Sequence, residues 1–433
     1  MFIVSSRYLK SEKMLERAQK SIPLGAQTYS KSKTQFPEGV SPFFAEYGKD
    51  GYLFDVDGNK YIDFINAQAS ILLGYNDPDV TMAVKEQLEK GSIFSLSNEL
   101  EIKVAEKIIE MVPCAEMVRF GKNGSDVTAG AIRLARAFTN RKYIAVCGYH
   151  GWQDWYIGST TKDLGVPEEI KELTLKFNYN DIKSLEKLFD EYPEQIAGVI
   201  LEPMNIEYPK KSFLQDVKEL TQKNNAVLIF DEMITGFRFA NGGAQELFGV
   251  VPDLATFGKA ISNGFPLSVI TGKSEIMQLM EEVFFSFTYG GETISLAAAL
   301  ATLDKIKNQD VVNDVYTKGE YVKTQINNLL NKYNLNKVMQ ITGHPSWNFL
   351  LFKDTEKYSS YEIKTFYMQE MLKRGILAYG THNISYAHTM ADLNTLIKST
   401  DDVFKDLMNY IENKTLLEHI KCMPLEPLFK VRG

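Results

Sequence analysis

Short apolar runs alternate with amphipathic helical stretches through the middle of the chain. The runs occupy residues 117–120, 143–147, 197–202, 226–231, 254–258 and 266–272. Nearly every position in them is apolar, as in strands of a parallel sheet that helices cover on both faces. Helical periodicity lies at residues 80–90, 98–112 and 295–306. The pattern predicts an α/β domain with a mostly parallel mixed sheet over residues 71–310.

The two ends of the chain have a different pattern. Residues 1–70 contain a short helical stretch at Glu12 to Gln19, then alternating apolar and polar positions around Asp57-Gly58-Asn59. Such alternation around a tight turn is typical of a hairpin and predicts an antiparallel meander. Residues 311–433 contain helical stretches at 311–333, 361–375 and 392–413 and an apolar run at 347–352. We expect the meander and this C-terminal part to belong to a smaller α+β domain.

Composition limits the possible classes of function. The 433 residues are 44% hydrophobic and 24% charged, as in ordinary soluble proteins. A net charge of −7 favours neither nucleic acid nor an anionic membrane. No run reaches the roughly 18 apolar residues that span a bilayer, and the N-terminal apolar patch is too short for a signal peptide. Three scattered cysteines, at positions 114, 147 and 422, predict neither disulfides nor a metal site, so we expect a cytoplasmic protein.

Ionisable side chains stand at the ends of three predicted strands. Glu202 closes the run 197–202, Asp231 closes 226–231, and Lys259 follows 254–258 directly. Burial of such a group is costly unless the group is paired or functional, and it lowers the pKa of a lysine. Taken alone, each acid could cap a helix or hold a loop, and the lysine could extend to the surface.

Two further motifs follow predicted strands. Gly124-Ser125-Asp126 opens a helix, where N–H groups and a hydroxyl can hold a phosphate, although an ordinary helix cap uses the same residues. Tyr149 can stack on a flat cofactor or serve as a structural aromatic, and His150 has a structural or supporting role. In a parallel sheet these strand ends share one edge. A phosphate cradle, a stacking ring, an acid and a lysine together indicate pyridoxal 5'-phosphate (PLP).

The chain resembles the class III aminotransferases, PLP-dependent enzymes of fold type I, and within them the glutamate-1-semialdehyde 2,1-aminomutases. The resemblance extends from about Tyr52 to His388. Residues 120–141 resemble the phosphate-loop segment of the family, and residues 147–151 its ring-stacking segment. The stretch from Asp231 to Gly272 resembles the segment between the acid at the ring nitrogen and the Schiff-base lysine.

The resemblance implies roles for residues around the cofactor ring. Lys259 would bind PLP covalently, and Asp231 would pair with the pyridine nitrogen. Tyr149 would stack on one face of the ring, and Met233 would pack on the other.

The resemblance also implies how the rest of the cofactor is held. Gly124 and Ser125 would bind the phosphate. Thr288 would bind the phosphate of the neighbouring subunit, which implies a homodimer with shared active sites. Glu202 and Asn205 would line the site near the oxygen of the cofactor.

The positions that the aminomutases use for their substrate differ in this chain. A Ser-Pro-x-Arg element is replaced by residues 29–33, a tryptophan by residues 68–70, and an acidic residue by residues 381–383. These segments are polar, so we expect a sugar-like carbonyl acceptor contacted by Lys31, Gln68 and Asn383.

Two functions remain open from the sequence. One is transfer of an amino group from an amino-acid donor to a carbonyl acceptor, and the other is an intramolecular aminomutase reaction. A non-catalytic protein of the same fold is disfavoured by the presence of both Lys259 and Asp231. A nicotinamide dehydrogenase is disfavoured because no Gly-x-Gly-x-x-Gly opens a helix after a strand.

Overall fold

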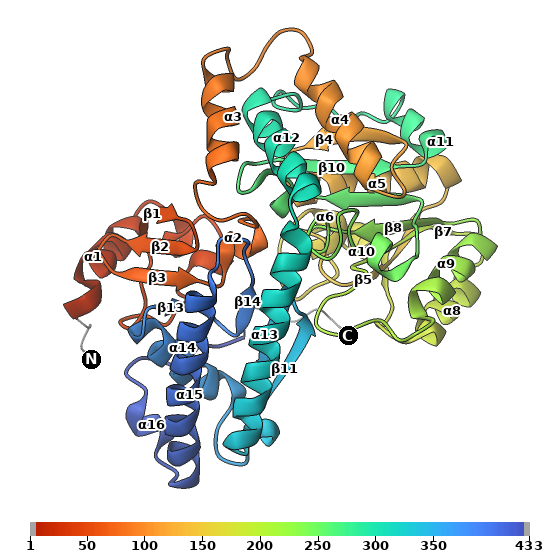
Figure 1. Cartoon of the computed structure of the whole chain (residues 1–433). Coiled ribbons are helices and arrows are strands. Elements are labelled where there is room, and N and C mark those ends of the chain that lie inside the picture. Colours follow the sequence, from red (N-terminus) through yellow and green to blue (C-terminus); the bar gives the residue numbers. More distant parts are fainter. Residues whose placement is uncertain (1–5, 428–433) are drawn as a thin grey trace. The chain divides into compact units, whose positions relative to one another are not determined.

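The computed structural model describes residues 6–427 (Figure 1). The chain divides into two compact units. The first unit contains the described residues up to Gln68, residues 73–76 and residues from 313 onward, and the second contains residues 69–72 and 77–312. Within the described residues, no helix combines the length and apolar character needed to cross a membrane.

The second unit is built on a seven-stranded sheet, counted over the described residues. In spatial order its strands are β4 (Met117–Gly121), β10 (Ser268–Gly272), β9 (Leu254–Phe257), β8 (Val227–Asp231), β7 (Ile196–Leu201), β5 (Tyr143–Cys147) and β6 (Thr174–Lys176). Neighbours from β9 to β6 are parallel, whereas β10 is antiparallel to both β9 and β4. The predicted α/β fold with a mostly parallel mixed sheet is confirmed.

Helices cover both faces of this sheet. One face packs against α5 (Gly124–Thr139), and the other against α8 (Ile182–Glu191) and α9 (Phe213–Lys223). Successive residues of a strand point to opposite faces, so Ile200 packs on the first face and Val199 on the second. This two-sided burial is why the strands are apolar at nearly every position. The remaining α-helices of the unit are α3 (Pro78–Leu88), α4 (Glu99–Met111), α6 (Asp154–Ile157), α7 (Glu168–Lys171), α10 (Ala244–Phe248), α11 (Ser274–Met277) and α12 (Thr293–Asn308).

The first unit contains two small sheets. In one, β1 (Ala45–Lys49), β2 (Tyr52–Asp55) and β3 (Lys60–Asp63) form the predicted antiparallel meander, and β13 (Ile376–Leu377) joins β3 in parallel. The other is antiparallel and consists of β11 (Met339–His344), β12 (Trp347–Phe352) and β14 (Thr381–Asn383). The α-helices of this unit are α1 (Leu9–Ala18), α13 (Val311–Lys332), α14 (Ser360–Lys373), α15 (Met390–Glu412) and α16 (Leu416–His419).

A left-handed turn, α2 (Asn66–Ala69), follows β3. Its four residues have φ values of +48°, +47°, +62° and +68°, although none of them is glycine. Such a conformation brings Cβ close to the next carbonyl oxygen and costs about 1–2 kcal/mol per residue. Hydrogen bonds within the first unit hold the turn, because Asn66 donates to the carbonyl of Asn383 and Tyr379 donates to Oε1 of Gln68 at 2.6 Å. Strain of this kind persists only where the surroundings fix the backbone.

The strain in α2 predicts an unusual effect of glycine. We expect Ala67→Gly to raise the free energy of unfolding by about 1 kcal/mol, because glycine adopts positive φ without the Cβ contact. Ala105→Gly, inside α4, should instead lower it by about 1 kcal/mol. Urea unfolding followed by circular dichroism measures both changes. If Ala67→Gly destabilises the chain as much as Ala105→Gly does, the turn is not strained.

Candidate active site

Loops at one edge of the second unit's sheet hold the candidate residues. The strands β5, β7, β8 and β9 are parallel, and β4 runs in the same direction because β4 and β9 are both antiparallel to β10. Their carboxyl ends therefore meet at one edge, where ligands bind in open α/β sheets. The residues at or just after these ends are Gly124, Ser125, Tyr149, Glu202, Asp231 and Lys259.

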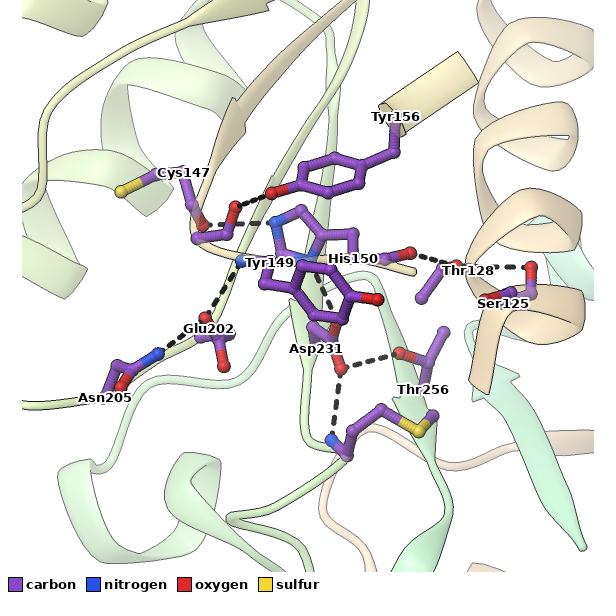
Figure 2. Close-up of polar contacts among 12 residues, drawn as sticks. Ser125, Thr128, Cys147, Tyr149, His150, Tyr156, Glu202, Asn205, Asp231 and Thr256 are labelled. Atoms are coloured by element: carbon purple, nitrogen blue, oxygen red, sulfur yellow. Dashed lines mark hydrogen bonds and ion pairs between the residues drawn. The ribbon is translucent and has the colours of Figure 1, made fainter. Parts of the chain in front are cut away.

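Asp231 and His150 form a buried pair at this edge (Figure 2). Nδ1 of His150 lies 2.8 Å from Oδ2 of Asp231, and both side chains are almost completely excluded from solvent. Nε2 of His150 lies 3.1 Å from the carbonyl oxygen of Cys147, so both ring nitrogens have polar neighbours. Oδ1 of Asp231 accepts from the backbone N–H of Met233 at 3.1 Å and from the hydroxyl of Thr256 at 3.5 Å. Polar contacts to both carboxylate oxygens fix the orientation of Asp231.

The loop that holds Tyr149 and His150 is anchored on two sides. The hydroxyl of Thr128 in α5 donates to the His150 carbonyl at 2.9 Å, and the hydroxyl of Tyr156 donates to the Gly148 carbonyl at 2.7 Å. The side chain of Tyr149 is 50% exposed, and its ring meets the edge of the Tyr156 ring at a centroid distance of 5.5 Å. An exposed ring in a fixed loop is able to stack on a planar ligand.

Glu202 is held against the same loop. Its Oε2 accepts from the Tyr149 N–H at 3.1 Å and from Nδ2 of Asn205 at 2.9 Å. Gly148 has φ of +107°, and a Cβ there would lie 2.5 Å from Glu202 Oε2, so the close approach requires glycine. Burial, and then the negative charge of Asp231, raises the pKa of Glu202. This carboxyl group is therefore more readily protonated, and able to donate a hydrogen bond, than an exposed glutamate.

Gly124 and Ser125 form the start of α5. N–H groups in the first turn of a helix have no acceptor within the helix, and the helix dipole favours an anion there. Oγ of the buried Ser125 accepts from the Trp152 N–H at 3.1 Å, which leaves its hydroxyl proton available. A Cβ at Gly151 would lie 2.3 Å from Ser125 Oγ, and one at Gly124 would lie 2.9 Å from Sδ of Met233. The two glycines therefore permit the close packing around this helix start.

Lys259 is the second residue after β9 and follows Gly258. Its φ is +46°, a value that is uncommon outside glycine and that often marks a functional site. Its side chain is partly buried, and burial lowers its pKa, while Asp231 and Glu202 act in the opposite direction. The positive charge of the fully buried Arg238 lowers the pKa of Lys259 further. A lowered pKa leaves more of the amine unprotonated and nucleophilic.

Of the other candidate residues, Thr288 belongs to the second unit, whereas Lys31, Gln68 and Asn383 belong to the first. Thr288 is exposed in the segment before α12, and in the described residues no contact links it to the side chains above. Lys31 and Gln68 line a cavity of about 370 Å³ inside the first unit. Asn383 is buried and does not line this cavity, and its Nδ2 donates to the carbonyl of Ile65 at 2.6 Å. Residues 6–427 contain no group of three or more acidic, His or Cys side chains that could hold a metal ion.

Some residues of the cluster have little or no sequence signal. The sequence indicates only a structural or supporting role for His150, whereas the structure pairs it directly with Asp231. The sequence feature that could have indicated this role is the position of His150, shortly after the end of a predicted strand and next to Gly151. Thr256 and Arg238 have none, because one lies inside an apolar strand and the other in a loop.

The family model, the relatives in sequence and the solved structures that resemble this chain all point to the same family of enzymes. The family model of class III aminotransferases matches residues 35–412. A 3-aminobutyryl-CoA aminotransferase from Cloacimonas acidaminovorans is 34% identical, with 89% of this chain and 94% of that protein covered. A glutamate-1-semialdehyde 2,1-aminomutase from Lachnoclostridium phytofermentans is 36% identical, with 92% and 99% covered. Among solved structures, the FumI protein of Sphingopyxis sp. MTA144 in its PLP form is similar, with a TM-score of 0.87, 26% identity, and 93% and 98% covered.

The lowered pKa of Lys259 predicts a pH-dependent effect on stability. Because burial disfavours the protonated amine, its cost is fully present below the lowered pKa and disappears as the pH rises toward the unfolded value of about 10.4. We therefore expect Lys259→Met to stabilise the cofactor-free chain near neutral pH, by an amount that shrinks in alkaline solution. Urea unfolding over a pH series measures it, with Lys183→Met on the surface of α8 as control. A stabilisation that does not change with pH would contradict this origin.

Proposed function

Since this chain belongs to the class III aminotransferases, we propose that it moves an amino group from an amino-acid donor to a carbonyl acceptor at the sheet edge of the second unit. The enzyme depends on PLP. When bound, PLP supplies an electron-withdrawing ring that weakens the bonds next to the substrate nitrogen. The observation that supports the assignment most is the amine of Lys259, with its lowered pKa, at the same edge as the buried Asp231–His150 pair.

Lys259 is the proposed attachment point and base. Its Nζ would bond covalently to the cofactor and, once displaced by the substrate nitrogen, would move a proton between the two carbon atoms beside that nitrogen. An unprotonated amine is required for both tasks, and the lowered pKa of Lys259 favours that form. The left-handed backbone at Lys259 aims the side chain from a fixed point at the end of β9.

Asp231 is the proposed partner of the pyridine nitrogen. Its carboxylate would accept a hydrogen bond from the protonated ring nitrogen and keep that proton in place. The fixed orientation supports this role, because His150 and the Met233 N–H hold the two oxygens before any ligand arrives. His150 acts through Asp231 and is a positioning residue.

The surrounding residues fit the remaining parts of PLP. We propose that Tyr149 and Met233 contact the two faces of the ring, and that Gly124 and Ser125 donate to the phosphate. The exposed ring of Tyr149 and the free hydroxyl proton of Ser125 support these roles.

Glu202 and Asn205 would line the site near the cofactor oxygen. The raised pKa of Glu202 supports a role as a hydrogen-bond donor there, and the hydrogen bond from Asn205 at 2.9 Å would hold it in position.

We further propose that the enzyme is a cytoplasmic homodimer in which Thr288 reaches the phosphate held by the partner. Thr288 is exposed, and Phe284 and Tyr289 close to it in sequence are 79% and 59% exposed. Exposed aromatic rings beside this threonine are typical of a surface that a second copy covers. Light scattering of the purified enzyme measures the assembly.

An intramolecular amino transfer is the second candidate function. Similarity to proteins named glutamate-1-semialdehyde 2,1-aminomutase supports it, whereas similarity to a protein named 3-aminobutyryl-CoA aminotransferase supports transfer between two molecules. The residues around the cofactor serve both reactions, so only the response to an external donor separates them.

The proposed role of Lys259 is tested by its removal. We expect Lys259→Ala to abolish covalent attachment of PLP and to lower turnover by about 10²–10⁴-fold or more, because attachment and proton transfer both need the amine. Mass spectrometry after borohydride reduction detects the attachment, and circular dichroism checks the fold. Reduction of Lys273→Met should still trap PLP at position 259. Covalent PLP in Lys259→Ala would overturn the assignment.

The two candidate functions predict different responses to amino donors. If the enzyme is an aminotransferase, glutamate, alanine or another amino acid in a donor panel should bleach the visible absorbance of the bound cofactor. An aminomutase should respond poorly, because it needs no separate donor. Absorbance spectroscopy with each donor, and with Lys259→Ala as the blank, distinguishes the two.

A further inference from the structure

An ion pair inside the second unit joins two segments that are far apart in the sequence. Nζ of Lys122 lies 2.9 Å from Oε2 of Glu292, and the two side chains are only 14% and 16% exposed. Lys122 lies between β4 and α5, whereas Glu292 directly precedes α12. Because two charges are costly to bury unless they remain paired, this contact constrains both segments.

Residues 122–125, which we call the phosphate turn, lead from β4 into the proposed phosphate site. The N–H groups of Lys122 and Asn123 donate to Oδ2 of Asp126 at 3.2 and 2.8 Å. The carbonyl of Asn123 accepts from the hydroxyl of Ser268 at 2.8 Å. The next two N–H groups along the chain are in the first turn of α5, where the helix offers them no acceptor. Their direction therefore depends on how the phosphate turn is held.

Glu292 is already fixed by contacts within its own segment. It caps α12, because its Oε1 accepts from the Ile294 N–H at 2.7 Å and its Oε2 accepts from the N–H and the hydroxyl of Ser295 at 3.2 and 2.6 Å. Burial disfavours its charged form, but the hydrogen bonds from Ser295 and Lys122 outweigh burial and lower the pKa of Glu292. The carboxylate is therefore ionised at neutral pH and holds the ammonium of Lys122 at a defined place.

The start of α12 is itself anchored in the second unit. The N–H of Thr293 donates to the Ser92 carbonyl at 2.8 Å, and Nε2 of Gln87 donates to the Thr293 hydroxyl at 3.0 Å. Thr293 is completely buried. Through Glu292, the phosphate turn is thus connected to a rigid helix end.

We propose that Lys122 and Glu292 are positioning residues for PLP, and that their ion pair holds the phosphate turn in the conformation in which Gly124 and Ser125 bind the phosphate. The inference rests on the proposed function and deepens it. Because Glu292 neutralises the ammonium of Lys122, the pair acts by directing the two N–H groups and not by attracting the phosphate. A turn that is ordered beforehand favours binding, because less motion is lost when the cofactor arrives.

Two forms of the cofactor that differ only in the phosphate test the proposal. Pyridoxal has the ring and the aldehyde of PLP, with a hydroxyl group in place of the phosphate ester. Equilibrium dialysis of the full-length enzyme, first stripped of cofactor, measures the dissociation constant of each form. The ratio of the two constants isolates the contribution of the phosphate.

Lys122→Met and Glu292→Gln each break the ion pair. Each should weaken the binding of PLP by about tenfold or more, because an interaction between charged groups is lost. Neither should change the affinity for pyridoxal. The double variant should bind PLP no more weakly than the weaker single variant, since both substitutions remove the same interaction. Lys122→Arg keeps the cation and should bind PLP like the unmodified enzyme.

Lys305→Met is the matched control. Nζ of Lys305 lies 2.7 Å from Oδ2 of Asp77, and the two side chains are 12% and 5% exposed, so this pair is also buried. Lys305 lies about 20 Å along α12 from Glu292, given the helical rise per residue. Its substitution should therefore leave the affinity for PLP unchanged. Circular dichroism checks that every variant folds.

The outcomes separate this inference from the proposed function. The inference is overturned if both single variants bind PLP like the unmodified enzyme, or if PLP and pyridoxal lose affinity equally, because the pair then has no specific effect on the phosphate. Weaker binding by Lys122→Met together with tighter binding by Glu292→Gln also overturns it, since Lys122 would then attract the phosphate directly. With saturating PLP, borohydride reduction should still trap the cofactor on Lys259 in every variant. If the unmodified enzyme traps none there, the proposed function itself fails.

Discussion

The hydrogen bond between His150 and Asp231 joins two buried polar groups at the ends of β5 and β8, with β7 between them. A buried carboxylate is costly unless it is paired, so each group requires the other. Their 2.8 Å separation holds only if the two strands and their loops are fixed. Thr128 and Tyr156 fix the loop after β5, and helices on both faces of the sheet fix the strands. The packing of the whole second unit thus determines one carboxylate orientation.

The same low-polarity surroundings act on the neighbouring ionisable groups. Burial lowers the pKa of Lys259 and raises that of Glu202, because in both side chains it favours the neutral form over the charged form. Asp231 opposes the shift at Lys259, whereas Arg238 adds to it. A site with this balance combines an amine ready to react with a fixed negative charge, which is the combination that amino-group transfer on PLP requires.

The two units contribute different chemistry. The second unit holds the residues proposed for the cofactor, on strand ends that share one edge. The first unit holds a cavity of about 370 Å³, and the lining of this cavity includes Ala67 and Gln68 of the strained turn.

The sequence by itself determined the elements with a local signal. Apolar runs predicted the strands of the large sheet, the turn at Asp57-Gly58-Asn59 predicted the hairpin, and strand-end positions drew attention to Asp231 and Lys259. A strand that is buried on both faces requires a continuous apolar run, and a tight turn requires particular residues at consecutive positions. Both features can therefore be recognised from residues that are adjacent in the sequence.

Only the tertiary structure decided which groups meet. The pairing of His150 with Asp231, the parallel addition of β13 to β3, and the hydrogen bond from Tyr379 to Gln68 join residues that are distant in sequence. The left-handed backbone at α2 contains no glycine, so the sequence gives no sign of its positive φ values. The strand β6 has only three residues, which are too few to show an alternation of apolar and polar positions. Contacts of this kind depend on distances in the folded chain, and residue order and periodicity carry no information about these distances.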